Sequence, residues 1–83
     1  MPAEQVIRNF IAREILQDRD PGVLTSDYAL IDEHVLDSMD IQRLVTFLEA
    51  QFGIRVTDDQ LLPDNFATIA AIAAMVESCR RHG

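Results

Sequence analysis

Ser38 lies four residues after His34, and these two residue types are members of the hydrolytic triad. The serine, however, is not embedded in a Gly-x-Ser-x-Gly turn, and the chain has only two histidines. No third residue is evidently placed to orient His34. The pattern therefore argues against a hydrolase and predicts no catalytic residues.

Two other groups have side chains that bind metals. The segment Asp18–Gly22 resembles the start of a calcium loop, but it lacks the third acid and has Ala29 at the twelfth position. It is better interpreted as a turn. Cys79 and His82 could supply two ligands, but no second pair exists. We expect Cys79 to be a half-buried helix residue and His82 part of a frayed end, and we predict no metal site.

Ser38 remains a candidate functional residue because it follows an acidic loop and opens an amphipathic stretch. Serine is a favoured helix N-cap, and capping alone would explain its presence. Asp37 competes for that position. If Asp37 is the cap, the Ser38 hydroxyl points outward at the first helical position. The backbone N–H groups and the positive end of the helix would then make this a suitable place for a phosphate group.

Apolar residues recur at helical spacing in three stretches, whereas alternation of period two is almost absent. The predicted helices cover about Ala3–Gln17, about Ser38–Phe52, and a segment that opens near Thr68. Their apolar stripes are Val6, Ile7, Phe10, Ile11, Ile15 and Leu16; then Ile41, Leu44, Val45, Leu48 and Phe52; and finally Ile69, Ile72, Ala73, Val76 and Cys79.

Between the first two helices, residues 23–37 have no sustained period and are predicted to form a long loop. Its apolar anchors are Leu24, Tyr28, Leu30, Ile31, Val35 and Leu36. Gly53 stands where a left-handed helix cap belongs. Thr57–Gln60 has a capping-box pattern and starts a brief third helix or turn before Pro63. We therefore predict an all-α fold with a single domain over residues 1–83. It is a small four-helix bundle with three long helices, one short helix and a long first loop.

The net charge and the composition limit the classes of binding partner and the cellular compartment that we expect. Seven arginines, no lysine and fourteen acidic residues give a net charge of −7, which disfavours nucleic acid and anionic membranes but suits a basic protein partner. The longest apolar run, Ile69–Val76, is too short to span a bilayer, so no stable membrane insertion is expected. No secretory signal is visible, and one cysteine cannot form an internal disulfide. We expect a cytoplasmic monomer.

Three short motifs then point to a known family. Leu36–Asp40 (Leu-Asp-Ser-Met-Asp) resembles the attachment motif of acyl carrier proteins. Leu48–Ile54 is similar to the Leu-Glu-x-x-Phe-Gly-Ile signature of that family, at the expected spacing, and Asn65–Ile69 resembles the segment that often opens its last helix. The resemblance covers roughly Val6–Val76. Each motif alone is weak, but three in order at the right spacing are specific.

This resemblance implies a carrier and not an enzyme. In such carriers a phosphopantetheinyl transferase attaches 4′-phosphopantetheine from coenzyme A to the serine, here Ser38, with Asp37 flanking it as the helix cap. The thiol of the arm holds an acyl or aminoacyl group as a thioester, which a loading ligase supplies and downstream transferases use. The second helix is the usual recognition surface. The resemblance thus assigns partner binding to Met39, Asp40, Gln42, Arg43 and Thr46.

The sequence also departs from the carriers of fatty acid synthesis. Arg43, Ala50 and Gln51 interrupt the acidic face of the second helix, Met39 stands where leucine is commonest, and Val35-Leu36 replaces the double glycine of peptide-synthetase carriers. A dedicated acyl or aminoacyl carrier of a specialised pathway fits at least as well. The alternative is an unmodified helical adaptor that binds a partner helix, but this reading does not explain why the three motifs agree.

Overall fold

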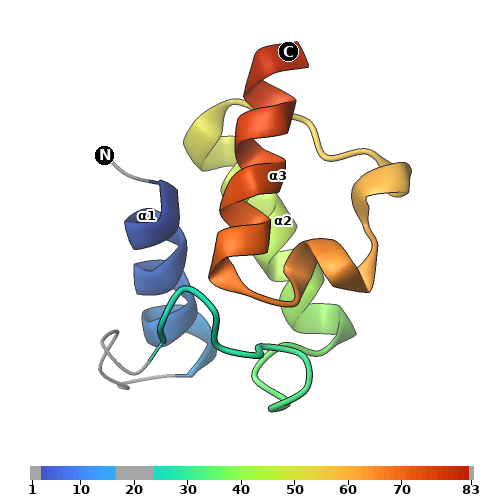
Figure 1. The fold of residues 1–83 in the computed structure, drawn as a ribbon. Helices are drawn as coiled ribbons and strands as arrows, with labels where there is room; N and C mark the ends of the chain where they lie inside the picture. The colour runs from blue at the N-terminus through green and yellow to red at the C-terminus, as the bar shows by residue number, and fades with distance from the viewer. Residues whose placement is uncertain (1–2, 17–23, 83) are drawn as a thin grey trace.

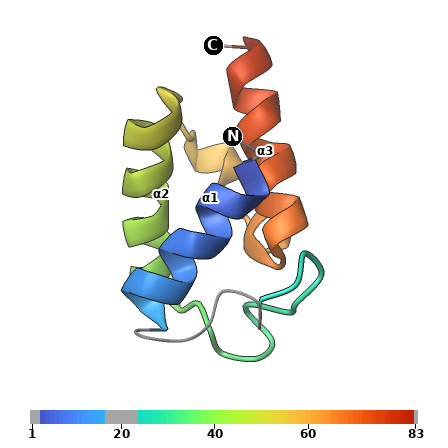
Figure 2. The ribbon, with the colours of Figure 1, turned by 90° about the vertical axis from the view of Figure 1, so that its left-hand side faces the viewer.

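The computed structural model describes residues 3–16 and 24–82, and within these ranges it contains helices, turns and no strand. The helical elements are α1 (Ala3–Phe10), η1 (Ile11–Ile15), α2 (Ser38–Phe52), η3 (Asp58–Gln60), η4 (Pro63–Phe66) and α3 (Ile69–His82). Figure 1 shows α1 beside α3, and Figure 2 shows α1 crossing in front of the other two α-helices. The all-α prediction is confirmed, while the predicted turn Asp18–Gly22 lies outside the described residues.

The first helix differs from the uniform α-helix that the sequence predicted. The α-helical part ends at Phe10, and the chain continues as a π-helical turn in which the Leu16 N–H donates to the Ile11 carbonyl at 2.9 Å. A π turn holds one residue more than an α turn, which shifts the faces of the residues that follow. Ile11 and the unpredicted Ala12 are both buried here.

The predicted brief helix or turn before Pro63 is present as the 3₁₀ turn η3, and the helical backbone is interrupted before a second 3₁₀ turn, η4, begins at Pro63. Pro63 explains the interruption, because it has no N–H to donate and disfavours α-helical backbone at the preceding Leu62. The predicted capping box is present, with the Gln60 side chain accepting from the Thr57 N–H at 3.0 Å. In the described part of the chain, the bundle therefore has three α-helices, and 3₁₀ turns occupy the place of a fourth.

The core contains side chains from all three α-helices and from the loop before α2. Leu44 and Leu48 from α2 are fully buried, as the predicted stripe required, and Met75 is a buried residue that the prediction missed. Cys79 is 8% exposed, so the expectation that it is half-buried was wrong. The buried residues are Ile7, Ile11, Ala12, Leu24, Leu30, Leu36, Leu44, Leu48, Val56, Phe66, Ile69, Ile72, Met75, Val76 and Cys79.

No helix among the described residues is long and apolar enough to cross a membrane.

A polar cluster on α1 holds the start of the loop. Nε of Arg8 donates to the Leu24 carbonyl at 2.6 Å, and Nη2 donates to the Ser26 hydroxyl at 3.3 Å. The Ser26 hydroxyl donates to Glu4, which also lies 3.7 Å from Arg8. The Ser26 carbonyl accepts from the N–H of Ala70 in the first turn of α3. Arg8 thus connects the loop to α1 at a point where the loop is also bonded to α3.

We predict that Arg8→Leu costs about 1–3 kcal/mol of unfolding free energy, because it leaves part-buried acceptors without their donor. Arg80→Leu is the matched control: Arg80 is half exposed and paired with Glu77 at 3.3 Å on the surface of α3. Loss of this surface ion pair should lower the unfolding free energy by less than about 0.5 kcal/mol. Urea denaturation followed by circular dichroism compares the two, and equal costs would contradict the assigned role of Arg8.

We also predict that Leu48→Ala costs about 2–5 kcal/mol, the range for emptied leucine sites in cores. Met39→Ala on the same helix should cost under about 0.5 kcal/mol, because Met39 is 75% exposed. The same denaturation series measures both variants. A larger loss for Met39→Ala than for Leu48→Ala would mean that the faces of α2 are assigned wrongly.

Candidate functional site

The site begins with the way in which α2 starts. Asp37 has extended backbone, and its Oδ1 accepts from the Asp40 N–H at 2.9 Å. In return, Oδ2 of Asp40 accepts from the Asp37 N–H at 3.3 Å. This reciprocal capping box satisfies two backbone donors at the helix end. The sequence left the capping residue open between Asp37 and Ser38, and the structure assigns it to Asp37.

Ser38 is consequently the first residue of α2, and it is exposed. Its hydroxyl is not needed to cap the helix. The N–H groups of the first helical turn that precede Asp40 have no acceptor inside the helix, and the helix end carries partial positive charge. An exposed hydroxyl beside such groups fits a phosphate ester, which would extend into solvent without displacing any core residue.

His34 does not complete a catalytic pair with this serine. In the described part of the chain no hydrogen bond joins the two side chains, and His34 is exposed. Its backbone is left-handed, with φ of 60°, and its N–H donates to the Ile31 carbonyl at 3.0 Å. His34 therefore belongs to the turn that leads toward α2.

The loop fixes the position of the serine through Leu30. The Leu30 carbonyl accepts from the N–H groups of Val35 and Leu36, at 2.8 and 3.1 Å, directly before the cap. The Leu30 N–H donates to the Ala67 carbonyl at 2.8 Å, at the end of η4. Because Leu30 and Leu36 are also buried, the loop that ends at Asp37 is held both by the core and by the segment before α3.

The structure brings the predicted partner-binding residues to the outward side of α2. Met39, Gln42, Arg43 and Thr46 are exposed, and Asp40 is partly exposed. Besides Asp40, two of these side chains, Arg43 and Thr46, already have intramolecular partners.

Nη2 of Arg43 donates to the Glu14 carbonyl at 3.1 Å, across to η1, and Nη1 lies 3.9 Å from Oδ1 of Asp40. The Thr46 hydroxyl donates to the Gln42 carbonyl at 3.1 Å. Both side chains therefore make contacts within the fold as well as facing outward.

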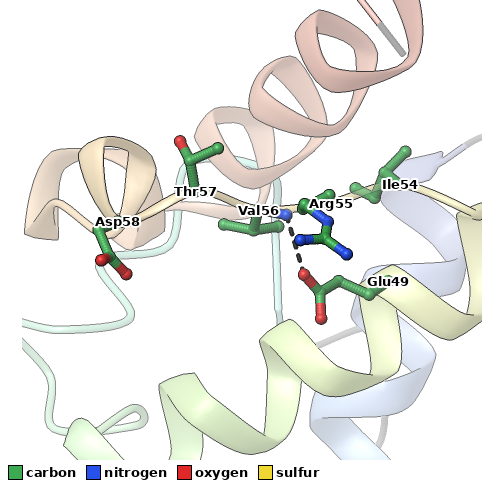
Figure 3. A pocket seen from close by; sticks show the side chains of 6 residues that line it. All are labelled: Glu49, Ile54, Arg55, Val56, Thr57 and Asp58. Atoms are coloured by element: carbon green, nitrogen blue, oxygen red, sulfur yellow. Dashed lines mark hydrogen bonds between the residues drawn. The ribbon is translucent and has the colours of Figure 1, made fainter.

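An open hollow of about 560 Å³ lies at the other end of α2, lined by Glu49, Ile54, Arg55, Val56, Thr57 and Asp58. Oε2 of Glu49 accepts a hydrogen bond from the Val56 N–H at 3.0 Å (Figure 3). Glu49 therefore holds the extended segment that follows α2 against the helix. Glu49 lies eleven positions after Ser38 in the helix, roughly 16 Å along the axis. The hollow is therefore separate from the serine. The described residues contain no group of three or more potential metal ligands.

Comparisons with known proteins agree with this geometry. A family model described as "Phosphopantetheine attachment site" matches residues 5–76. The chain is 30% identical over 79 residues to the "Probable acyl carrier protein PigG" of Serratia sp. (strain ATCC 39006). The aligned residues make up 95% of this chain and 90% of that protein.

Two solved structures have the same fold. One, described as "Structure of KstB-PCP(apo)", matches with a TM-score of 0.80 and 32% identity over 96% of this chain and 88% of that chain. A chain from the "Crystal structure of FAD-dependent dehydrogenase" matches with a TM-score of 0.77 over 84% of this chain and 97% of that chain. Its identity is 23%, so this second likeness bears on the fold alone.

We predict that Asp37→Ala costs about 0.5–2 kcal/mol of unfolding free energy, because the cap is lost at one of the longest helices. Asp37→Asn should retain most of that stability, since an amide oxygen also accepts from the helix N–H. Asp32→Ala, an exposed acid in the preceding loop, is the control and should change little. Thermal and urea unfolding measure all three, and an Asp37→Asn variant as unstable as Asp37→Ala would argue against capping.

Proposed function

The chain belongs to the family of proteins with a phosphopantetheine attachment site, and from this premise we propose that Ser38 is the serine that bears the arm. The protein is an acyl carrier protein whose cofactor is covalently attached 4′-phosphopantetheine. The observation that carries the proposal for Ser38 is its exposed position at the first residue of α2, where Asp37 takes over the cap. The alternative of an unmodified adaptor is not favoured, because the family model and the relative both describe carriers.

Attachment of the phosphopantetheine arm requires a nucleophilic oxygen on this chain that another enzyme can reach. A phosphate ester forms at Oγ of Ser38 while the pyrophosphate bond of coenzyme A breaks and adenosine 3′,5′-bisphosphate leaves, and the transferase removes the hydroxyl proton. The serine needs no base of its own, which fits the absence of a hydrogen bond between the side chains of His34 and Ser38 in the described ranges. Once bound, the arm supplies the thiol that holds the cargo. Proteins of this family carry groups and do not transform them.

For the cargo and the partners, we propose an acyl or aminoacyl group that a ligase loads and downstream transferases remove. The relatives support this class, since one is described as an acyl carrier protein and the other as a PCP, a peptidyl carrier protein. A flexible arm raises the effective concentration of the cargo at each docked enzyme, so the carrier itself needs only weak, reversible contacts. We place these contacts around Ser38, on Met39, Asp40 and Gln42, with Arg43 and Thr46 at the edge of the surface.

We predict that Ser38→Ala abolishes uptake of phosphopantetheine from coenzyme A, measured by intact mass after incubation with magnesium and a phosphopantetheinyl transferase. The helical circular dichroism signal should be retained, because one exposed hydroxyl contributes little to packing. Ser78→Ala is the matched control and should be modified like the wild type. Labelling of Ser38→Ala at any other position would remove the proposal.

A further inference from the structure

An open groove of about 330 Å³ runs between the first helix and α2, where the first helix crosses in front of α2 in Figure 2. Its apolar lining consists of Val6 and Phe10 on α1 and Phe47 on α2. The rings of Phe10 and Phe47 stack with their centroids 4.1 Å apart, and both side chains remain partly exposed. The groove therefore offers an aromatic surface that an apolar group of a ligand can cover.

This groove lies on a different side of α2 from the attachment site. Phe47 follows Ser38 by nine positions, which is about two and a half turns of α-helix. The two side chains consequently leave the helix on opposite flanks. A ligand in the groove would leave Ser38 accessible, so the groove is a separate site.

Two exposed side chains of opposite charge, Arg13 and Glu14, line the groove together from the π turn η1. Neighbouring residues on an ordinary α-helix do not face the same way. A π turn holds one residue more than an α turn, so successive side chains are closer together around the axis, and such turns are frequent at functional sites. Nη2 of Arg43 holds this turn against α2 by donating to the Glu14 carbonyl at 3.1 Å. The π turn thus brings a cation and an anion to one groove.

The polar groups of the groove suit a ligand that carries both charges. Within the described ranges, the side chains of Arg13, Glu14 and Gln51 make no hydrogen bond or ion pair. Oδ1 of Asn9 accepts from Nε2 of Gln5 at 3.0 Å, which leaves the NH₂ group of Asn9 as a donor. The guanidinium and the amide can bind a carboxylate, while the Glu14 carboxylate can bind an ammonium group. A ligand without net charge is also not repelled by a chain of net charge −7.

We propose that this groove binds a free α-amino acid with a large apolar side chain, in its zwitterionic form. Arg13 pairs with the carboxylate, Glu14 pairs with the ammonium group, and the apolar side chain lies against Phe10 and Phe47. An α-amino acid presents these three groups on one carbon atom, whereas a ligand with a single charge leaves Arg13 or Glu14 without a partner. The volume of the groove is at the lower end of the range for small-molecule sites, which suits a ligand of this size.

The test is an amide NMR titration of the full, unmodified chain with L-phenylalanine up to about 10 mM. Three analogues each lack one of the recognised groups: phenylpropanoate lacks the ammonium group, phenylethylamine lacks the carboxylate, and glycine lacks the apolar side chain. Arg13→Gln and Glu14→Gln each remove one charge from the groove. Arg80→Gln, on the surface of α3, is the matched control. Circular dichroism should show a native fold for all three variants, because the replaced side chains are exposed.

We expect saturable shifts of the groove residues with a dissociation constant on the order of 1 mM, as befits a small ligand on an open site. Each analogue, and each of the two groove variants with L-phenylalanine, should bind at least about threefold more weakly, whereas Arg80→Gln should match the wild type.

Three results would overturn this site. They are no saturation by about 10 mM, shifts centred outside the groove, and equal affinity in any comparison that removes one of the recognised groups. The assignment of Ser38 is tested separately, because the titration uses no transferase and no coenzyme A.

Discussion

The hydrogen bonds between Asp37 and Asp40 determine what this protein can do with its serine. Serine is itself a good helix cap, and a helix that began one residue later would use the Ser38 hydroxyl as an acceptor for its own backbone. Asp37 caps the helix in place of the serine, and Asp40 completes the capping box by accepting from the Asp37 N–H. Ser38 is thereby held rigidly at a helix end while its oxygen stays available. A carrier needs this combination, because another enzyme must find the oxygen in a reproducible position.

The position of that cap depends in turn on the loop before it. A domain of this size has a small core, and a single cysteine offers no internal disulfide to support it. The loop compensates by contributing three fully or nearly fully buried leucines, Leu24, Leu30 and Leu36. Its backbone is bonded to both α1 and the start of α3, through Arg8 and Ala70. The described part of this loop, residues 24–37, is thus a packed part of the fold and not a loose connection.

Much of this arrangement could be predicted from sequence, because local patterns decide it. The bounds of α2, its buried Leu44 and Leu48, and the left-handed cap at Gly53 follow from helical periodicity and from glycine at a helix end. The π turn and the second 3₁₀ turn, η4, did not follow from the helical periodicity. The bonds of Arg8 and Arg43 to carbonyls sixteen and twenty-nine residues away in sequence have no local signal at all.

The distribution of charge carries a further consequence for how such a protein is recognised. An excess of acid over base gives a long-range field that attracts basic partners, but that field acts on the encounter and not on the final contact. In this carrier, the two acids of α2 accept from its own backbone, and the exposed acids of the described residues lie in the loop before α2, on η3 and η4, and on η1 and α3. Large apolar side chains next to Ser38 and on the η3–η4 turn remain uncovered. A contact with these apolar side chains, unlike one with the exposed acids, would not be screened by salt.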